Sequence, residues 1–452
     1  MLQNFSKPSA LLFYPLIFLF LFSCQQHDSN GISEKAMFMG DKQHTGTYNY
    51  PSIKTQPEIL WKVETGGKVI SSPVISNDIV YVGSGDSTLY AIDAQSGDIS
   101  WTYKTEGAIH STPLVTQGNV MFLSYDGFFY ALDQSDGELK WKFKTNGESR
   151  FQVKDYYNGS FKEDFWDFYL SSAVANDDFV YFGSSDSNIY ALDINSGEMA
   201  WSYKTNGSIH SSPAISNNVL VTGSWDSNIY GLNAATGEEN WIFSTGKDFE
   251  TYIWLGIQAS PSIDNDVVYI GSRDAKFYAL DLNTGDSLWT KDAFDRSWMP
   301  STAAIDSNAI YTGSSDSFSF FSMDRNTGEI NYATNTKAYT FSSPAIDDEM
   351  AYIGSANGRL YGITLKTGDI QWEFATTGAR TDTLNIFDSK GVMDIERYKS
   401  LTKGIGDMPT LSAFMEDAFI QGGAILSSPA LSDQVIYFGS SDGYIYAISD
   451  KP

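Results

Sequence analysis

Short apolar strands separated by turn residues recur along this chain. In the clearest copy, residues 79–83 read IVYVG and residues 89–93 read LYAID, with the turn Ser84 to Asp86 between them. Val80 and Val82 fall on one side of an extended chain and Tyr81 on the other, a period of two that is typical of a β-strand. A Gly-containing turn follows, and the next strand begins near Trp101. With a strand before residue 79, each copy is predicted to hold four short strands.

The copies follow one another along the chain, and each opens with a Ser or Thr followed by Pro or Ala. These eight markers are Pro73, Pro113, Ala173, Pro213, Pro261, Ala303, Pro344 and Pro429. A repeat of about 40 residues with four strands is the signature of a β-propeller blade. A single blade cannot bury both of its faces, so eight blades must stack in a ring.

The last copy is incomplete, and the missing strand lies at the other end of the chain. The eighth copy ends at Pro452 before a fourth strand, whereas residues 59–63 (ILWKV) precede the first marker without strands of their own. We therefore predict that this N-terminal segment completes blade eight, which removes the free edges of an open ring. The predicted fold is all-β, a single eight-bladed β-propeller of four-stranded blades over residues 40–452.

Three intervals between markers are longer than the rest, at 60, 48 and 85 residues. The excess falls near residues 148–170, 247–258 and 379–426, in each case between the last strand of one blade and the first strand of the next. These connections lie on one face of a propeller together with the turns between the second and third strands. Since loops commonly carry function, we predict that this face binds a ligand or partner. Within the third insertion, a short helix is expected over residues 392–403.

The insertions hold candidate binding residues. Tyr156 and Trp166 lie in an aromatic run of the first insertion, Trp254 in the second, and Arg380 in the charged third. Aromatic side chains beside Asp and Asn suit stacking on sugar rings or gripping a protein. The alternative interpretation is that these side chains simply pack onto the propeller.

Two histidines share one repeat position, three residues before the marker. His110 and His210 lie there in alternate blades, and Gln258 lies at the same position in the next blade. Because the first strand of a blade lines the central channel, both imidazoles could ligate a metal or bind a small acid. Alternatively, they hydrogen-bond turn amides as part of the repeat. No metal ligand set is assigned.

A second repeat position carries an acidic residue or Asn in every blade. Its occupants are Asp86, Asp126, Asp186, Asp226, Asp274, Asp316, Asn357 and Asp442. A ring of carboxylates could bind cations, but a position filled in nearly every blade is better explained by the turn itself. For the same reason no catalytic pair is assigned.

Composition and charge narrow the partner class. The formal net charge of −26 argues against nucleic acid, whose phosphates need Lys and Arg for neutralisation. Residues 10–22 (ALLFYPLIFLFLF) are too few for a typical membrane-spanning helix and are typical of a signal peptide.

The predicted signal peptide, residues 1–23, ends in Leu-Phe-Ser before Cys24, the single cysteine of the chain. This ending resembles a bacterial lipobox, so Cys24 is expected to be lipidated, followed by a polar tether over residues 24–39. An unmodified thiol after an ordinary secretory signal is the alternative. Either way, no disulfide can form within the chain. The expected location is the bacterial cell envelope, at the outer membrane.

The turn before the last strand of each blade carries a family resemblance. Ala91, Asp93, Gly97 and Trp101 recur with the same spacing in most copies, and this pattern resembles the tryptophan-docking motif of pyrroloquinoline quinone (PQQ)-like propeller repeats. The resemblance implies that the aromatic residue packs between neighbouring blades. The predicted docking residues are Trp61, Trp101, Trp141, Trp201, Trp241, Trp289, Tyr332 and Trp372.

The resemblance leaves three functions open. BamB-type outer-membrane assembly lipoproteins are non-catalytic scaffolds with envelope proteins as partners, and this is the function we expect, without a resident cofactor. A second branch, the dehydrogenases, binds PQQ with Ca²⁺ and oxidises alcohols or sugars. The chain departs from these enzymes because it lacks adjacent cysteines and a convincing set of calcium ligands. The third possibility, polysaccharide binding at the cell surface, rests on the aromatic insertions.

Overall fold

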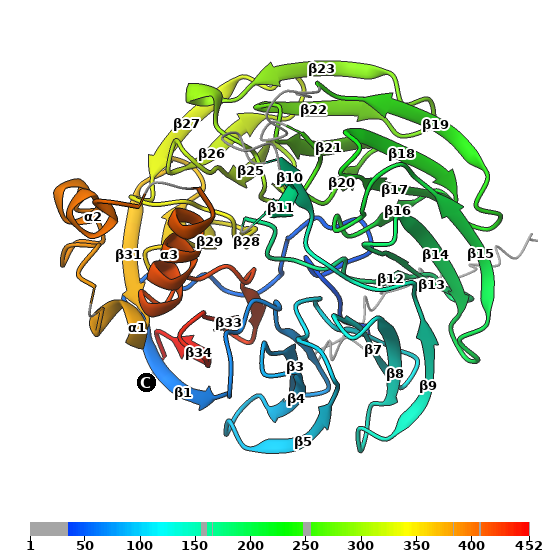
Figure 1. Cartoon of the computed structure of the whole chain (residues 1–452), viewed down its shortest axis with the longest axis horizontal. Helices are drawn as coiled ribbons and strands as arrows, with labels where there is room; N and C mark the ends of the chain where they lie inside the picture. The colour runs from blue at the N-terminus through cyan, green and yellow to red at the C-terminus, as the bar shows by residue number, and fades with distance from the viewer. Residues whose placement is uncertain are drawn as a thin grey trace, which may run out of the picture. The chain divides into compact units, whose positions relative to one another are not determined.

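The computed structural model describes residues 35–154, 161–164, 166–246, 255–382, 384–405 and 408–451. Within these ranges, eight four-stranded antiparallel sheets follow one another around a central axis (Figure 1). The predicted all-β, eight-bladed propeller is confirmed. None of the helices in these ranges is long and apolar enough to cross a lipid bilayer.

Each blade runs from an inner strand A to an outer strand D, and each strand pairs with the next. Blades 1 to 4 comprise β2 (Val74–Ser76), β3 (Ile79–Gly83), β4 (Thr88–Asp93) and β5 (Ile99–Lys104); β6 (Leu114–Thr116), β7 (Asn119–Ser124), β8 (Phe128–Asp133) and β9 (Leu139–Lys144); β12 (Val174–Ala175), β13 (Phe179–Gly183), β14 (Asn188–Asp193) and β15 (Met199–Lys204); and β16 (Ala214–Ser216), β17 (Val219–Gly223), β18 (Asn228–Asn233) and β19 (Glu239–Ser244).

Blades 5 to 8 comprise β20 (Ser262–Asp264), β21 (Val267–Ser272), β22 (Lys276–Asp281) and β23 (Ser287–Asp292); β24 (Ala304–Ile305), β25 (Ala309–Gly313), β26 (Ser319–Asp324) and β27 (Ile330–Asn335); β28 (Ala345–Ile346), β29 (Met350–Gly354), β30 (Arg359–Thr364) and β31 (Ile370–Ala375); and β32 (Ala430–Ser432), β33 (Val435–Gly439), β34 (Tyr444–Ser449) and β1 (Glu58–Glu64). The N-terminal strand β1 pairs antiparallel with β34, so the predicted closure of blade 8 is confirmed.

A β-bulge in every outer strand places its aromatic residue. In blade 1 the register shifts between Ala91 and Ile92, and the same shift occurs in β1 between Ile59 and Trp61. A bulge increases the local twist and redirects the side chains beside it. The shared bulge shows that β1 is built like any other outer strand, although it comes from the opposite end of the chain.

The predicted docking residues lie between adjacent blades. The indole N–H of Trp61 donates to Ala94 O at 2.9 Å, and that of Trp241 to Leu282 O at 2.8 Å, in each case in the turn before strand D of the next blade. A glycine is required in that turn: Gly285 has φ +74°, and a Cβ there would lie 2.6 Å from Trp241. The same bond is made by Trp101, Trp141, Trp201, Trp289 and, through its hydroxyl, Tyr332.

The eighth aromatic contact has a different acceptor. Trp372 donates to Ile53 O at 2.8 Å. Ile53 lies in the segment of residues 35–57 before β1, which we call the lead-in. Blade 8 has no continuous turn at this point, because its last two strands come from opposite ends of the chain. The lead-in therefore supplies the acceptor that the missing turn would have carried.

The earlier part of the lead-in lies against the inner strands. Ala36 forms an antiparallel bridge with Val115, and Ile263 N donates to Gln43 O at 2.8 Å. His44 is buried, and its Nδ1 lies 3.0 Å from Pro261 O. Residues 36–39, placed in the tether by the sequence prediction, are thus packed within the propeller. In Figure 1 this blue segment crosses the centre of the ring.

The insertions add a few elements of their own. The first contains the hairpin of β10 (Gln152–Lys154) and β11 (Phe161–Glu163). The third contains α1 (Thr377–Arg380), α2 (Ile395–Thr402) and α3 (Met408–Gln421), and α2 confirms the helix predicted over residues 392–403. A short 3-10 turn, η1 (Phe294–Arg296), follows β23. Residues 247–254 of the second insertion lie outside the described ranges.

Candidate functional site

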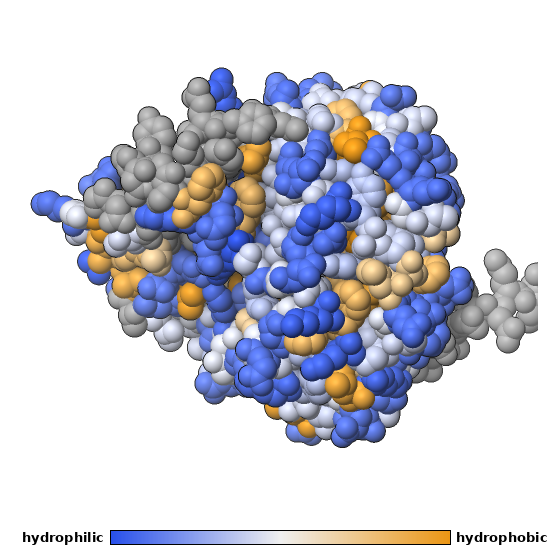
Figure 2. Space-filling view, turned by 45° about the vertical axis from the view of Figure 1, so that its right-hand side comes forward, coloured by the Kyte–Doolittle hydropathy of each residue, from blue (hydrophilic) through white to orange (hydrophobic). Residues whose placement is uncertain are grey.

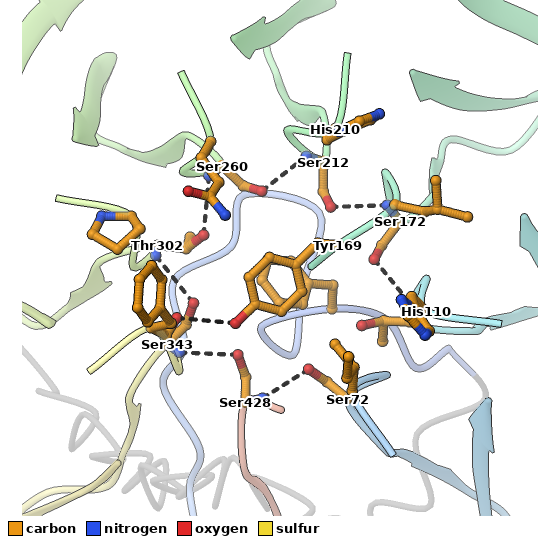
Figure 3. Close-up of a pocket in the computed structure, with 17 residues that line it drawn as sticks. Ser72, His110, Tyr169, Ser172, His210, Ser212, Ser260, Thr302, Ser343 and Ser428 are labelled. Carbon is orange, nitrogen blue, oxygen red and sulfur yellow. Dashed lines mark hydrogen bonds between the residues drawn. The ribbon is translucent and has the colours of Figure 1, made fainter. Parts of the chain in front are cut away.

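The channel through the ring is lined by the residues that begin each strand A. One ring of lining positions consists of hydroxyl side chains, with Tyr169 inside it (Figure 3). Its members are Ser72, Thr112, Ser172, Ser212, Ser260, Thr302, Ser343 and Ser428. The position two residues earlier lines the mouth of the channel in blades 1 to 7, and includes His110, His210 and Gln258.

The hydroxyl ring ties neighbouring blades together. The amide of Ser172 donates to the hydroxyl of Ser212 at 2.9 Å, and the amide of Ser428 donates to Ser72 at 2.8 Å across the closure of the ring. Seven such bonds between adjacent blades are formed in the described structure. The Ser or Thr before each marker is therefore needed to satisfy backbone amides at the crowded centre. The sequence carried this signal in every copy, but its role was not predicted.

The first insertion folds back over the channel mouth, where three polar side chains hold it: those of His110, His210 and Gln258. His110 Nδ1 lies 2.8 Å from Phe168 O, and Gln258 Nε2 donates to Trp166 O at 2.6 Å. His210 Nδ1 lies 2.8 Å from the Asp167 carboxylate. The three side chains thus contact three consecutive residues of one segment. This gives His110, His210 and Gln258 a structural explanation that the repeat alone did not suggest.

His110 is neutral in this position. Its burial, assisted by the nearby charges of Lys68 and Arg150, lowers the pKa of His110 to about 3. With a neutral ring, Nδ1 carries the hydrogen and donates it to Phe168 O. The contact is therefore an ordinary neutral hydrogen bond that persists over the whole physiological pH range.

His210 lies in a different electrostatic environment. Burial alone would lower its pKa, but the carboxylates of Asp167 and Glu148 outweigh that effect and raise the pKa of His210 above its usual value. Its other ring nitrogen, Nε2, lies 2.7 Å from the hydroxyl of Ser185. Both ring nitrogens are engaged, so His210 cannot ligate a metal in this arrangement.

A buried arginine anchors the same insertion from blade 5. The Arg273 guanidinium lies between two indole rings, 4.4 Å from the centroid of Trp225 and 4.2 Å from that of Trp298. It forms an ion pair with Asp164 and donates to Gln258 Oε1 at 3.0 Å. Arginine suits this position because its flat cation can stack on aromatic faces while its edge donates hydrogen bonds.

A second ion cluster joins the first and third insertions. Arg150 donates two hydrogen bonds to the Glu416 carboxylate of α3, at 2.8 and 3.1 Å, and Lys68 of blade 1 donates a third at 2.7 Å. Burial would raise the pKa of Glu416, but these bonds and the two positive charges lower it to about 2. The cluster fixes α3 beside the first insertion at the channel mouth.

Apolar side chains fill the rest of the mouth. The ring of Trp166 stacks on Phe341 at 5.3 Å between centroids and contacts Phe419 of α3 at 5.6 Å. Tyr169 enters the channel, where its hydroxyl donates to Leu426 O at 2.8 Å. The first insertion and α3 therefore close this end of the channel with side chains of the protein itself.

Of the remaining predicted site residues, the structure describes Arg380. Arg380 is exposed, and its guanidinium lies over Phe374 at 5.4 Å from the ring centroid. Tyr156, Trp254 and Cys24 lie outside the described residues. Of the aromatic candidates, Trp166 is the one that the structure places, and it packs onto the propeller.

The acidic ring has a structural role in most blades. Asp86 accepts from Thr88 N at 2.9 Å within its own turn and from Gly66 N at 2.7 Å in the connection from the preceding blade. It also accepts from the hydroxyl of Tyr90 at 2.7 Å. Asp126, Asp186, Asp226 and Asp442 make corresponding sets of bonds. Among the described residues, no cluster of three or more His, Cys, Asp or Glu side chains is suited to a metal ion.

The channel mouth does not fit PQQ with calcium. PQQ is an anionic quinone, which needs cationic donors, and its calcium ion needs oxygen ligands with negative charge. Among the described residues, the side chains that line the channel are hydroxyl, imidazole, amide, aromatic and aliphatic groups, with no carboxylate or guanidinium. The nearby charged groups, Arg273, Asp164, Arg150 and Glu416, are already paired with one another.

The fold and the docking contacts define a PQQ-type repeat propeller. The chain belongs to the family described as outer membrane protein assembly factor BamB, whose sequence model matches residues 54–154 and 163–374. No curated protein matches the chain in sequence.

Solved structures share the fold at low identity. BamB from Moraxella catarrhalis is 18% identical, with 87% of this chain and 99% of that chain covered and a TM-score of 0.64. A quinohemoprotein alcohol dehydrogenase from Comamonas testosteroni is 13% identical, with 91% and 80% covered and a TM-score of 0.66. The computationally designed Ika8 protein is 14% identical, with 86% and 99% covered and a TM-score of 0.61. These likenesses extend to BamB, an alcohol dehydrogenase and a designed protein, so they concern the fold alone.

Proposed function

We propose that this protein is a scaffold of the bacterial cell envelope, anchored by a lipid on Cys24, that binds outer-membrane proteins during their assembly. Membership of the BamB family supports a role in the assembly of outer-membrane proteins. The observation that carries the scaffold role is the closed channel mouth, because Trp166, Tyr169 and Phe419 occupy the place where a propeller commonly binds a small ligand. The proposed scaffold needs no resident cofactor.

The outer side of the insertions is the proposed contact surface. Helix α2 has no buried residue, and Val392 and Ile395 are 46% and 50% exposed. A helix of eight residues is only marginally stable in isolation and normally relies on tertiary packing. Ile395 opens this helix and Val392 lies three residues before it, so the two exposed apolar side chains suit a protein partner.

The outer strands offer a matched control. Ile99 and Met199 are apolar and similarly exposed, at 48% and 52%, but lie on the rim of the ring. Figure 2 shows apolar residues scattered among polar ones on the face it presents, so single exposed apolar side chains are not unusual here. Comparing the two positions separates a specific surface from general hydrophobicity.

The test is crosslinking of the full lipidated protein in intact envelopes, followed by purification and mass spectrometry. Val392→Asp and Ile395→Asp are expected to abolish recovery of outer-membrane assembly proteins, whereas Ile99→Asp and Met199→Asp leave it unchanged. Equal recovery with all four variants would contradict the proposed surface. Recovery of no envelope protein by the unaltered chain would contradict the scaffold function.

Anchoring is tested separately. Cys24→Ser is expected to move the protein from the membrane fraction to the soluble fraction and to remove incorporation of labelled fatty acid. Retention of both properties by the variant would overturn the proposed lipid anchor.

A further inference from the structure

Three residues beside the closed channel mouth form a hydrogen-bonded chain of hydroxyl, imidazole and carboxylate. Ser185 Oγ lies 2.7 Å from His210 Nε2, and His210 Nδ1 lies 2.8 Å from the Asp167 carboxylate. His210 and Asp167 are 2% and 0% exposed, whereas Ser185 is partly exposed. The three come from the turn between β13 and β14, the start of blade 4, and the first insertion. Distance and order match those of a nucleophile, a base and the residue that orients the base.

Asp167 fixes the orientation of the imidazole. Its carboxylate also accepts from Phe151 N at 2.6 Å, which holds it in place. With Nδ1–H directed to Asp167, the lone pair of Nε2 in the neutral ring points at the Ser185 hydroxyl. Trp225 packs edge-on against the ring, and its indole N–H is directed at Nδ1 from 3.2 Å. The imidazole is therefore held between a carboxylate and a serine rather than being free to rotate.

A carboxylate lies where the oxyanion of an acyl intermediate would form. Glu148 accepts from Ser185 N at 2.8 Å and from the Ser184 hydroxyl at 2.6 Å, beside the Ser185 side chain. A backbone N–H of the nucleophile and a neighbouring donor are the groups that stabilise such an oxyanion. The pair already holds a carboxyl oxygen of Glu148, whose pKa is raised by burial, so its geometry suits an oxygen acceptor.

We propose that Ser185 is an activated nucleophile for acyl transfer from small esters, and that Glu148 covers its oxyanion position in the resting protein. The Ser185 oxygen bonds to the acyl carbon while its proton passes to His210 Nε2. The bond from that carbon to the ester oxygen then breaks, and the proton passes to the departing alcohol. The oxygen of a water, deprotonated in turn by His210, bonds to the acyl carbon. The bond from that carbon to the Ser185 oxygen then breaks, the proton returns to that oxygen, and the carboxylic acid leaves. Asp167 acts as a positioning residue.

The repeat supplies internal controls for this serine. Ser315 and Ser441 occupy the same repeat position in blades 6 and 8. The Ser441 hydroxyl donates to Phe419 O at 3.0 Å, and that of Ser315 lies 3.0 Å from Asp316. Neither hydroxyl is bonded to a histidine. The three serines thus differ in their partners while sharing one backbone setting.

The experiment treats the purified full chain with a fluorophosphonate and locates the adduct by peptide mass spectrometry. In this reaction the Ser185 oxygen bonds to phosphorus, fluoride leaves, and the proton passes through His210 to solvent. We expect labelling at Ser185 but not at Ser315 or Ser441, and a loss of about a thousandfold in rate for His210→Asn. Glu148→Ala is expected to raise the rate about 100-fold, because it frees the oxyanion donors.

The dependence on pH separates a nucleophile from a merely structural serine. Because the base must be unprotonated, the labelling rate should rise as pH increases through the pKa of His210. The charged groups facing this ring are Asp167 and Glu148, so Glu148→Ala should move the midpoint to lower pH. A structural serine would show neither dependence.

The proposal is overturned if Ser185 is labelled no faster than Ser315 and Ser441 in both the unaltered chain and the Glu148→Ala variant. Thermal unfolding of each variant ensures that a lost label does not reflect a lost fold. Since no partner protein is present, the outcome is independent of the scaffold function proposed above.

Discussion

The outer ring of aromatic contacts and the channel mouth are built on the same eight-fold repeat, but they use it in opposite ways. In the outer ring, nearly every blade places an aromatic residue in the same bond to its neighbour. At the mouth, equivalent positions hold different residues, such as His110, His210 and Gln258, and each contacts the first insertion. Positions that keep the same residue type in nearly every blade stabilise the contacts between blades. Positions at which the residue type differs between blades contact the insertions.

The outer ring should be the more sensitive region. Trp241 is 6% exposed and bonded to Leu282 O, so Trp241→Ala removes a large buried side chain and is expected to cost about 4 kcal/mol of unfolding free energy. Chemical denaturation measures the loss. Trp241→Phe, which keeps an aromatic ring but not the N–H donor, should cost less. Equal unfolding midpoints for the Ala variant and the unaltered protein would contradict a structural role for this ring.

At the mouth, removal of the stacked cation should loosen one insertion. Arg273→Ala leaves the Asp164 carboxylate buried without its partner, at an expected cost of about 3 kcal/mol. Hydrogen exchange should increase over residues 151–170 and remain unchanged in the outer strands. Arg325→Ala is the matched control, because the Arg325–Asp264 pair is more exposed and lies away from the mouth. Unchanged exchange in the insertion would contradict the anchoring role.

The smallest of these effects depends on pH. The pKa of Glu416 is about 2 in the folded protein against an ordinary value of 4.5, so its ion cluster stabilises the fold above pH 4.5. That stabilisation, about 2 kcal/mol once solvent screening of the partly exposed side chains is allowed for, is lost as the pH falls from 4.5 towards 2. Glu416→Gln should remove it at neutral pH and flatten the acid limb of the stability profile. Glu396→Gln, in an exposed pair with Lys399, should change neither.

The sequence predicted the features that recur in every blade. The eight blades, the closure by β1 and the location of the insertions follow from spacing, because each blade is stabilised by contacts with its neighbours. His110, His210 and Gln258 could be singled out because they are polar, whereas the other residues at the same position are apolar. What could not be predicted is that all three contact the first insertion. A spacing gives the length of an insertion but not the direction in which it folds.

The partners of those residues were missed for the same reason. Asp167 and Glu148 lie in the first insertion, Ser185 and Arg273 in ordinary turns, and Glu416 in α3. Their interactions join segments up to 348 residues apart, as between Lys68 and Glu416. One local signal was available. Arg273 and Trp225 stand at a turn position where most other blades carry Gly, Ser or Ala, and such bulky exceptions could have indicated the docking side.

Blade 8 pairs the first strand of the chain to be synthesised, β1, with the last, β34. Glu64 pairs with Tyr444, so β1 emerges 380 residues before its partner strand. At typical elongation rates the nascent chain waits about 20 to 80 seconds for that partner. Throughout this interval β1 has an unsatisfied edge, and so does each newly made blade at the growing end. A chain of this design therefore depends on being kept apart from its neighbours until translation ends, and loss of its final strand would leave every molecule with an open edge able to pair with another copy.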